Sequence, residues 1–219
     1  MNYQYVIFDF NGTILDDVDL CLNLLNEMLE MRHHEKCSLE KYKKIFTFPI
    51  IEYYKKAGFD FKVDSFEELA SYFIKKYQPA SYHCKLNDHL IELLDYLKAK
   101  KIKIICLSAS ERNNLIDQLQ VFKIDHYFEA ILGTSDIYAK SKLEIAKDYF
   151  KNHHIDTKEC LFIGDTLHDL DIAEALNSSC LLVDFGHQDR SLFENRKAKV
   201  ISSFLEVEKY LCSRQFYLI

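Results

Sequence analysis

The chain has 219 residues, of which 48% are hydrophobic, and its formal net charge at neutral pH is −6. This length and apolar content are enough for a sizeable core, built as one large domain or as one domain with a smaller insert. The sequence shows no apolar stretch near the ~20 residues of a membrane span, no long Lys/Arg block and no signal peptide, so we expect neither membrane nor nucleic-acid partners.

The seven cysteines favour a reducing compartment, because their number is odd and no two have the C-x-x-C spacing. Two of them, Cys106 and Cys160, lie in apolar runs that predict core strands. We therefore expect buried, reduced thiols in a cytoplasmic protein, without a local cluster of zinc ligands.

The first apolar run covers residues 5–10 and carries a carboxylate, Asp9, near its end. Because the run is continuous rather than alternating, it predicts a strand buried on both faces, as in a parallel sheet. Gly12 and Thr13 then end this strand.

The next part of the chain, residues 16–83, shows no clear buried strand and is predicted to be helical. Apolar residues recur at helical spacing over 18–31, with Asp17 available as N-cap. A capping-box pattern at Ser65 begins a second helix, which Pro79 is expected to end. We interpret this part as a helical insert that caps the strand ends.

After the insert, short apolar runs alternate with helical patterns, which predicts a doubly wound α/β sheet. The predicted strands lie at 102–107, 130–132, 160–163 and 180–183. The predicted helices lie at 88–100, 112–122, 142–152 and 169–176. Functional groups of such sheets gather beyond the carboxyl ends of the strands. Asp9, Ser108 and Asp165 are therefore expected at one edge.

Four short motifs occur in the order found in the haloacid dehalogenase superfamily. Residues 9–13, Asp-Phe-Asn-Gly-Thr, resemble its first motif, D-x-D-G-T. Ser108 resembles the second motif, and Lys142, with Lys140 as the alternative, resembles the third. Residues 164–169, Gly-Asp-Thr-Leu-His-Asp, resemble the fourth motif, G-D-x-x-x-D.

The resemblance covers the whole chain and is to the phosphoglycolate phosphatase-like branch, which carries a helical cap. It implies a Rossmann-like core formed by residues 1–15 and 84–219, and a cap formed by residues 16–83. It also implies a phosphatase that binds Mg²⁺ and acts on a small phosphorylated metabolite. The sequence names neither the substrate nor the oligomeric state.

By resemblance, Asp9 attacks phosphorus and forms an aspartyl-phosphate. Mg²⁺ suits oxygen ligands, and the implied ligands are the Asp9 and Asp165 carboxylates and the backbone carbonyl of Asn11. Asp169 is expected to bind a metal water or to orient its neighbours. Asp171 follows closely and adds to this acidic cluster.

The remaining expected residues surround the phosphoryl group. The Ser108 hydroxyl and the Lys142 ammonium are expected to hold phosphoryl oxygens as charge develops. Gly12 allows a tight turn that brings amides toward the phosphate, and Thr13 and Ala109 are expected beside it.

The first motif departs from the family pattern at Asn11, where phosphatases have an Asp that acts as acid and base. An amide cannot exchange a proton near neutral pH, and a lost acid/base is worth ~10²–10⁴-fold in rate. One outcome is slow turnover, or turnover only of substrates with good leaving groups. A second is a proton supplied from the predicted substrate-facing segment 46–54, which contains Glu52, Tyr53 and Tyr54.

Two further outcomes change the function itself. The chain could bind a phosphorylated ligand as a regulatory protein without turnover. It could also be a phosphonate hydrolase, since those relatives lack this Asp and use a cap lysine. The cap contains Lys43, Lys44, Lys55 and Lys56.

Simpler structural roles compete with several of these assignments. Ser108 or Ser110 could cap the helix that follows, and Asp165 could be an N-cap. His168 lies inside the fourth motif and is a candidate for contact with the site. Residues 186–188, Gly-His-Gln, resemble a segment of phosphoglycolate phosphatase-like proteins, without a role that we can assign.

Overall fold

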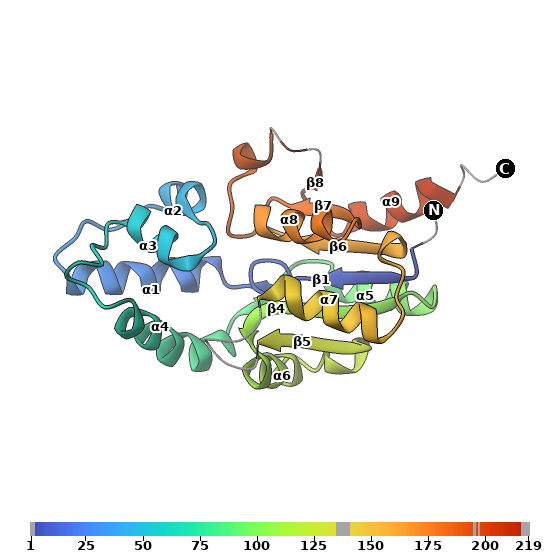
Figure 1. Ribbon diagram of the computed structural model, residues 1–219, viewed down its shortest axis with the longest axis horizontal. Helices are drawn as coiled ribbons and strands as arrows, with labels where there is room; N and C mark the ends of the chain where they lie inside the picture. The colour runs from blue at the N-terminus through green and yellow to red at the C-terminus, as the bar shows by residue number, and fades with distance from the viewer. Residues whose placement is uncertain (1–2, 135–140, 195, 197, 216–219) are drawn as a thin grey trace.

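The computed structural model describes residues 3–134, 141–194, 196 and 198–215. In this part of the chain, six strands form a parallel sheet in the order β5-β4-β1-β6-β7-β8 (Figure 1). The strands are β1 (Tyr5–Phe8), β4 (Lys103–Glu111), β5 (Ala130–Thr134), β6 (Cys160–Gly164), β7 (Ser179–Val183) and β8 (Lys199–Ile201). The predicted α/β class is therefore confirmed.

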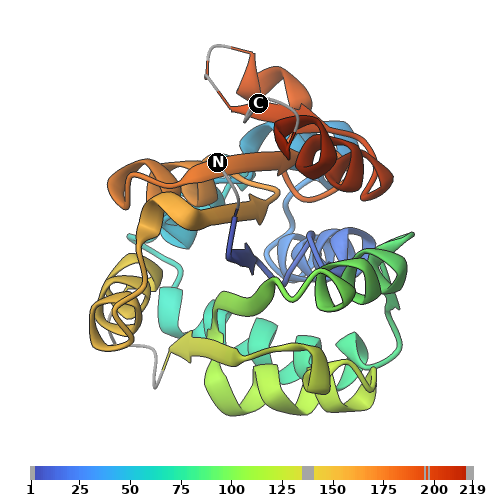
Figure 2. The same ribbon diagram turned by 90° about the vertical axis from the view of Figure 1, so that its right-hand side faces the viewer.

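Helices cover both faces of the sheet (Figure 2). One face carries α5 (Leu90–Ala99), α6 (Arg112–Val121) and α9 (Leu205–Gln215), and the other carries α7 (Lys142–Asn152) and α8 (Leu167–Ala175). Within the described ranges, three short 3₁₀ turns lie in the connections: η1 (Asp125–Tyr127), η2 (Thr157–Glu159) and η3 (Arg190–Phe193).

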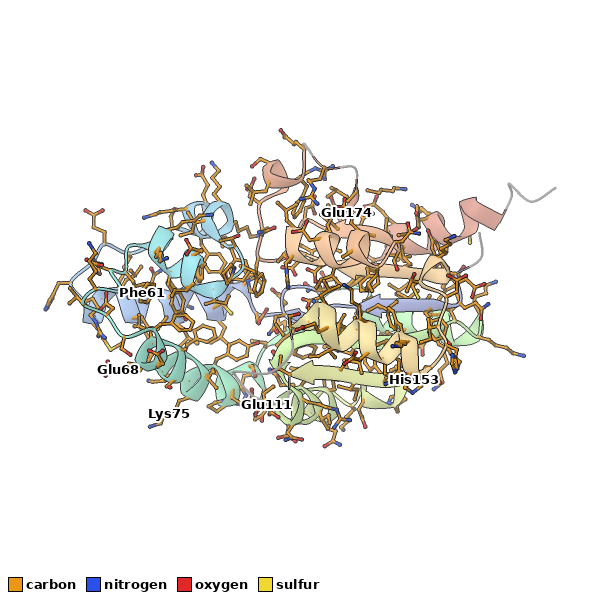
Figure 3. All side chains as sticks on the ribbon, in the orientation of Figure 1. Phe61, Glu68, Lys75, Glu111, His153 and Glu174 are labelled. Atoms are coloured by element: carbon orange, nitrogen blue, oxygen red, sulfur yellow. The ribbon has the colours of Figure 1, made fainter. Side chains whose placement is uncertain are left out.

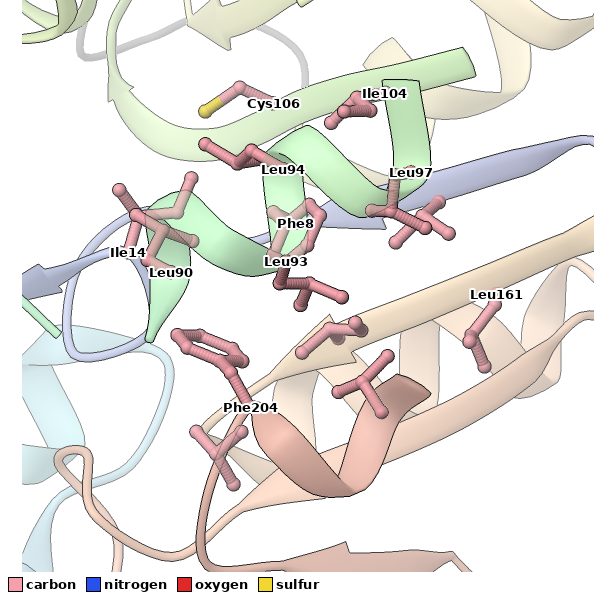
Figure 4. Packing of buried hydrophobic residues seen from close by; sticks show 14 of the residues in the cluster. Phe8, Ile14, Leu90, Leu93, Leu94, Leu97, Ile104, Cys106, Leu161 and Phe204 are labelled. Atoms are coloured by element: carbon pink, nitrogen blue, oxygen red, sulfur yellow. The ribbon is translucent and has the colours of Figure 1, made fainter. Parts of the chain in front are cut away.

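The central strand shows why its sequence is apolar throughout. Val6 and Phe8 belong to the cluster on the α5 face, whereas Ile7 belongs to the cluster on the α7 face. Leu93 and Leu97 of α5 pack onto the first of these faces, next to Phe8 (Figure 4). Successive strand side chains point to opposite faces, so a strand covered twice needs an unbroken apolar run.

The predicted insert forms a separate helical group at the carboxyl ends of the strands, at the left of Figure 1. Its helices are α1 (Val18–Met31), α2 (Leu39–Ile45), α3 (Ile50–Ala57) and α4 (Phe66–Ser81), which pack around their own apolar cluster. The start of β1 and the helix α9 lie toward the opposite end of the molecule (Figure 1). A helical cap over the sheet agrees with this arrangement, and the bounds 16–83 stay a prediction.

The chain passes twice between the sheet and the helical group, before α1 and after α4, and the two connecting segments are hydrogen bonded to each other. β2 (Leu15–Asp16) pairs antiparallel with β3 (Lys85–Leu86). Asn87, directly after β3, donates its side-chain amide to the backbone carbonyl of Thr13 at 2.8 Å. The second connecting segment is thus bonded to the loop that follows Asp9.

Of two predictions about helix ends, the one for Asp17 is confirmed in position only and the one for Pro79 is wrong. Asp17 occupies the N-cap position of α1 but makes no side-chain cap hydrogen bond. Pro79 does not end α4, which continues to Ser81. The Ser81 hydroxyl donates to the carbonyl of Gln78 at 2.7 Å and accepts a hydrogen bond from the Gln118 amide at 2.8 Å, so a contact with α6 holds this last turn.

Other features agree with the sequence. All seven cysteines are free, and Cys106 and Cys160 are buried in strands. The Ser65 hydroxyl accepts a hydrogen bond from the backbone of Glu68, as expected for the start of α4. Over the described residues, none of the helices combines the length and apolar character needed to cross a bilayer.

Candidate active site

The sheet brings three of the predicted residues to one edge. β1 lies between β4 and β6, and Asp9 follows β1 while Asp165 follows β6. Ser108 lies within β4, which extends beyond the predicted end at residue 107. The convergence of these side chains therefore follows from parallel neighbouring strands that end at the same level.

Lys142 reaches this edge from the first residue of α7. Ser141 caps that helix in a complete capping box with Glu144, which fixes where the helix begins. The Lys142 ammonium is buried and donates to the Asp9 carboxylate and, at 2.5 Å, to Asp169. The alternative, Lys140, lies outside the described residues.

The charge of Lys142 is held by its partners. Burial, the largest single influence, lowers the pKa of this ammonium, but Asp169 and Asp9 together outweigh burial, and the pKa is raised overall. Lys142 is therefore a fixed cation between two carboxylates.

Asp9, Asp165 and Asp169 form a carboxylate cluster in which one oxygen from each residue lies within 4.8 Å of the other two. Burial is the largest cause that raises the pKa of Asp9 and of Asp165, and the neighbouring Asp169 charge adds to both shifts. With all three carboxylates ionised, one lysine would leave an excess of negative charge, which a bound cation would offset. This donor set fits a hard divalent cation, which prefers oxygen ligands.

The start of α8 corrects two expectations. Thr166, rather than Asp165, is the N-cap, and the Asp169 carboxylate accepts hydrogen bonds from the Thr166 hydroxyl at 2.7 Å and its backbone at 3.1 Å. Asp171 does not join the acidic cluster, because it points outward and pairs with Arg196 at 2.7 Å. Asp9 completes the cluster instead.

Asp165 is held in a crowded site. Its carboxylate accepts hydrogen bonds from the Thr13 hydroxyl at 3.2 Å and from the backbone of His187 at 2.6 Å. Gly12 has a φ of +72°, and a Cβ atom there would lie 2.3 Å from the Asp165 carboxylate. A side chain at position 12 would thus be strained and would also displace Asp165.

Neither serine of the second motif caps the next helix. The Glu111 side chain caps α6 by accepting from the backbones of Asn113 and Asn114. The Ser110 hydroxyl donates to the Asn11 side-chain oxygen at 3.0 Å, and the Ser108 hydroxyl lies 3.5 Å from the same atom. Ser108 is buried, whereas Ala109 beside it is exposed.

Asn11 bridges the serines to the helical group. Its side-chain nitrogen donates to the Asp17 carboxylate at 2.9 Å and to the Tyr77 hydroxyl at 2.5 Å. Tyr77 comes from α4, and its hydroxyl also donates to Asp17 at 2.5 Å. The orientation of the Asn11 amide is therefore defined from both ends.

Asp17 and His187 form a second buried ion pair. The Nε2 atom of His187 lies 3.2 Å from the Asp17 carboxylate, and its Nδ1 atom hydrogen bonds with the Tyr42 hydroxyl at 2.8 Å. Burial, the largest influence, opposes ionisation of both groups. Their mutual attraction outweighs it, so the pKa of Asp17 is lowered and that of His187 is raised.

Cys21 lies near this pair, and ligand atoms of Cys21, Asp17 and His187 also lie within 4.8 Å of one another. The hydrogen bonds described above already engage both Asp17 oxygens. We therefore interpret this group as a hydrogen-bonded pair rather than as a metal centre.

Aromatic side chains join the helical group to the sheet. The ring of Phe46 stacks on His187 with centroids 4.7 Å apart, and Phe48 stacks on His168 at 4.8 Å. The Gln188 amide donates to the carbonyl of Phe46 at 2.8 Å. His168 and the segment 186–188 therefore contact the helical group at the site edge.

The other cap residues singled out from the sequence lie in different surroundings. Tyr53 and Tyr54 are buried in the cap cluster, and Glu52 pairs with Lys55 at 2.6 Å in an exposed contact. Lys44 pairs with Glu40. Lys56 is exposed, and Lys43 donates to the backbone carbonyl of Phe185 at 3.3 Å. The described contacts thus give three of these four lysines partners outside the carboxylate cluster.

Two residues labelled in Figure 3 show how far the sheet extends from this edge. His153 is exposed and lies at the end of α7 that is far from the cap, whereas Glu111 lies at the boundary between α4 and the sheet (Figure 3). The site residues that the sequence did not identify are Asp17, Tyr42, Tyr77 and Ser110, together with a role for His187. The two adjacent carboxylates at 16 and 17 are the local sequence feature that could have pointed to the contacts around Asp17.

Comparison with known proteins gives a consistent picture. The family model described as haloacid dehalogenase-like hydrolase matches residues 6–183. A 5'-nucleotidase of Pseudomonas aeruginosa is 22% identical over 188 residues, which cover 85% of each chain. A phosphoglycolate phosphatase of Mesorhizobium japonicum is 29% identical over 108 residues, or 49% of this chain and 47% of the relative.

Among solved structures, a protein of Clostridium acetobutylicum described as a predicted phosphatase has a TM-score of 0.82. It is 21% identical in sequence, and the match covers 97% of this chain and all of the other. At this identity the likeness supports the fold, including the helical group above the sheet.

Proposed function

Because the chain belongs to the haloacid dehalogenase-like hydrolase family, we propose that it is a Mg²⁺-dependent phosphatase of small phosphorylated metabolites. The observation that carries this proposal is the buried group formed by Asp9, Asp165, Asp169 and Lys142. Relatives named 5'-nucleotidase and phosphoglycolate phosphatase support the same chemical class.

The proposed reaction has two steps. A carboxylate oxygen of Asp9 attacks phosphorus, the bond from phosphorus to the leaving oxygen breaks, and an aspartyl-phosphate forms. Water then attacks phosphorus, the bond to Asp9 breaks, and the water proton leaves with the phosphate. Lys142, already a fixed cation beside Asp9, stabilises charge on the phosphoryl oxygens in both steps.

The neighbouring residues prepare these steps. Asp9 and Asp165, with the backbone carbonyl of Asn11, would hold Mg²⁺, which when bound neutralises charge between carboxylates and phosphate. Asp169 positions Lys142 through its 2.5 Å contact and is available to a metal water. Ser108 and the backbone around Gly12, Thr13 and Ala109 complete the proposed phosphate cradle.

The test is phosphate release from p-nitrophenyl phosphate and from a panel of acyl, aryl and alkyl phosphates. We expect release that requires Mg²⁺ and that falls by at least about 10³-fold in Asp9→Asn. Asp117→Asn, which removes an exposed carboxylate on α6, is the matched control and should keep the wild-type rate. Equal rates for wild type and Asp9→Asn across the panel contradict the proposal.

A second candidate, phosphate binding without turnover, is favoured by the fixed amide at Asn11. It requires Mg²⁺-dependent binding of inorganic phosphate, measured by calorimetry, together with no release from any substrate in the panel. Release that depends on Asp9 excludes it.

A further inference from the structure

The two outer strands of the sheet differ in how their edges are protected. A strand at the edge of a sheet presents unpaired N–H and C=O groups, and proteins often keep such a strand short or place a lysine on it. β8 follows this rule, because it has three residues and begins with the exposed Lys199. β5, at the other edge, has five residues, Ala-Ile-Leu-Gly-Thr, and carries no charge. Its edge is therefore open to another strand.

The hydrogen bonds at the start of β5 show which backbone groups face outward. The N–H of Glu129, directly before the strand, donates to the carbonyl of Ile104 in β4 at 2.8 Å, so residue 129 faces β4. Backbone groups of successive strand residues alternate in direction, so those of Ala130 and Leu132 point away from β4. In the described part of the chain no strand lies beyond β5. Four backbone groups, placed symmetrically about Ile131, are thus available for pairing.

A hollow of about 400 Å³ runs along this edge. It is lined by residues 128–132, by Arg112 of α6 on one side, and by Tyr149 and His153 of α7 on the other. Residues 130–132 are half-buried, and an added strand would lie about 4.8 Å from them, between the two helices. A half-buried apolar floor with available backbone groups suits the addition of a strand.

Two opposite charges flank the hollow on one face of the sheet. Ile131 packs against the cluster on the α5 face, and side chains two residues apart share a face, so Glu129 lies on this face too. Arg112 lies on the same face near the other end of β5, because a Cβ atom on Gly133 would lie 2.8 Å from the Cα atom of Arg112. Arg112 thus stands where Gly133 lacks a side chain.

We infer that the β5 edge binds the β5 edge of a second copy of this chain, as an antiparallel pair about a two-fold axis at Ile131. In this register, Ala130 of each copy lies opposite Leu132 of the other, and these residues exchange four backbone hydrogen bonds. Glu129 of each copy lies opposite Gly133 of the other, and therefore beside Arg112. The two-fold axis repeats this contact, so two charged pairs form at once.

The order of the charges is the reason to choose a second copy as the partner. A strand that adds antiparallel to β5 must bring a positive group to Glu129 and a negative group to Arg112, and β5 with its own flanking residues does so. Within one chain, Glu129 pairs with Lys103 at 2.9 Å, and the Nε atom of Arg112 donates to the Ile131 carbonyl at 3.2 Å. Both side chains stay exposed, and the other guanidinium donors of Arg112 suit a carboxylate.

The test is self-association of the whole chain, measured by sedimentation equilibrium up to about 1 mM protein. Wild type should form a species of twice the 25.9 kDa monomer mass. Arg112→Glu and Glu129→Arg each place like charges at both contacts, so each should raise the dissociation constant at least about tenfold. Lys75→Glu, an exposed change on the cap (Figure 3), is the matched control and should associate as wild type does.

A mixture of the two variants separates this contact from a general loss of folding. In a mixed dimer, Arg112→Glu brings two acidic groups and Glu129→Arg brings two basic groups, so both contacts again join opposite charges. The equimolar mixture should therefore associate within about threefold of wild type, although neither variant does so alone. A misfolded variant cannot recover in this way.

The variant Ile131→Cys tests the register, because residue 131 of one copy faces residue 131 of the other at a Cα separation that a disulfide can span. Mild oxidation should link it into a dimer, whereas wild type and Val121→Cys, an exposed change on α6, should stay unlinked. A monomeric wild type, a dimer that withstands both charge reversals, or a mixture no more associated than its components overturns the inference. The proposed function does not depend on any of these results.

Discussion

Two buried ionic groups flank Asn11, and they differ in charge balance. On the sheet side, Lys142 stands among three carboxylates. On the cap side, the Asp17 carboxylate has His187 as its cation, and neutral donors complete its surroundings. When its carboxylates are ionised, the first group is short of positive charge and can take up a cation, whereas the second pairs one carboxylate with one cation. Buried charge can therefore mark a ligand site in one place and a structural junction in another.

The largest expected effect is on the sheet-side group. Lys142→Met removes the cation between Asp9 and Asp169 while it keeps an unbranched side chain, and we expect kcat to fall by about 10²–10³-fold. Lys151→Met, an exposed change on the same helix, is the control. Steady-state release from acetyl phosphate measures both, and an unchanged kcat in Lys142→Met would remove Lys142 from the site.

The next effect tests whether the carboxylate excess holds a metal. Asp165→Asn should raise the Mg²⁺ concentration for half-maximal activity at least about tenfold, because it removes a charged oxygen ligand. Mg²⁺-induced stabilisation in thermal unfolding gives an independent reading. If the Mg²⁺ response of Asp165→Asn equals that of Asp117→Asn, the metal site lies elsewhere.

On the cap side the expected effect is on stability. His187→Phe keeps a ring to stack on Phe46 but removes both ring nitrogens, and we expect a loss of about 1–3 kcal/mol in unfolding free energy. Chemical denaturation without Mg²⁺ measures it. The matched control is His153→Phe, because His153 is exposed and stacks on Tyr149.

The pH dependence of that loss has a defined sign. The pKa of His187 is raised from its ordinary value of 6.5. The stabilisation that the charged ring gives to the folded state is therefore complete below pH 6.5, and it is lost as the pH rises through the raised pKa. The difference between wild type and His187→Phe should therefore be larger at about pH 6 than at about pH 9. A difference that grows with pH contradicts the ion pair.

The smallest effect tests the boundary of the acidic cluster. Asp171→Asn breaks an exposed pair with Arg196, so the unfolding free energy should change by less than about 1 kcal/mol. Its Mg²⁺ dependence should match that of wild type. If Asp171→Asn needs more Mg²⁺ than wild type, Asp171 contributes to the metal site after all.

The sequence predicted the sheet side far better than the cap side. Continuous apolar runs located five strands, and their shared edge placed Asp9 near Asp165 without any contact being known. β8 was missed because it spans only Lys199–Ile201, too short for a pattern. Lys142 was preferred over Lys140 because residues 141–146 resemble the family branch in which the lysine opens the helix, and the structure does place Lys142 at the first position of α7.

The cap side left no such sign. Asp17 before a helix is typical of an N-cap, and its burial depends on residues 60 and 170 positions away. Tyr77 lies on the apolar face of its helix, where a tyrosine is usually part of the core. Contacts between distant segments decide both roles, and periodicity carries no information about them.

The β2–β3 pair has a mechanical consequence. It ties both connecting segments together within a few residues of Gly12, and Asn87 bonds the second segment to the Thr13 carbonyl. The two connections between cap and sheet therefore share one short hydrogen-bonded segment beside the reacting carboxylate. A change in the angle between cap and sheet would have to bend the chain at this segment, close to Asp9.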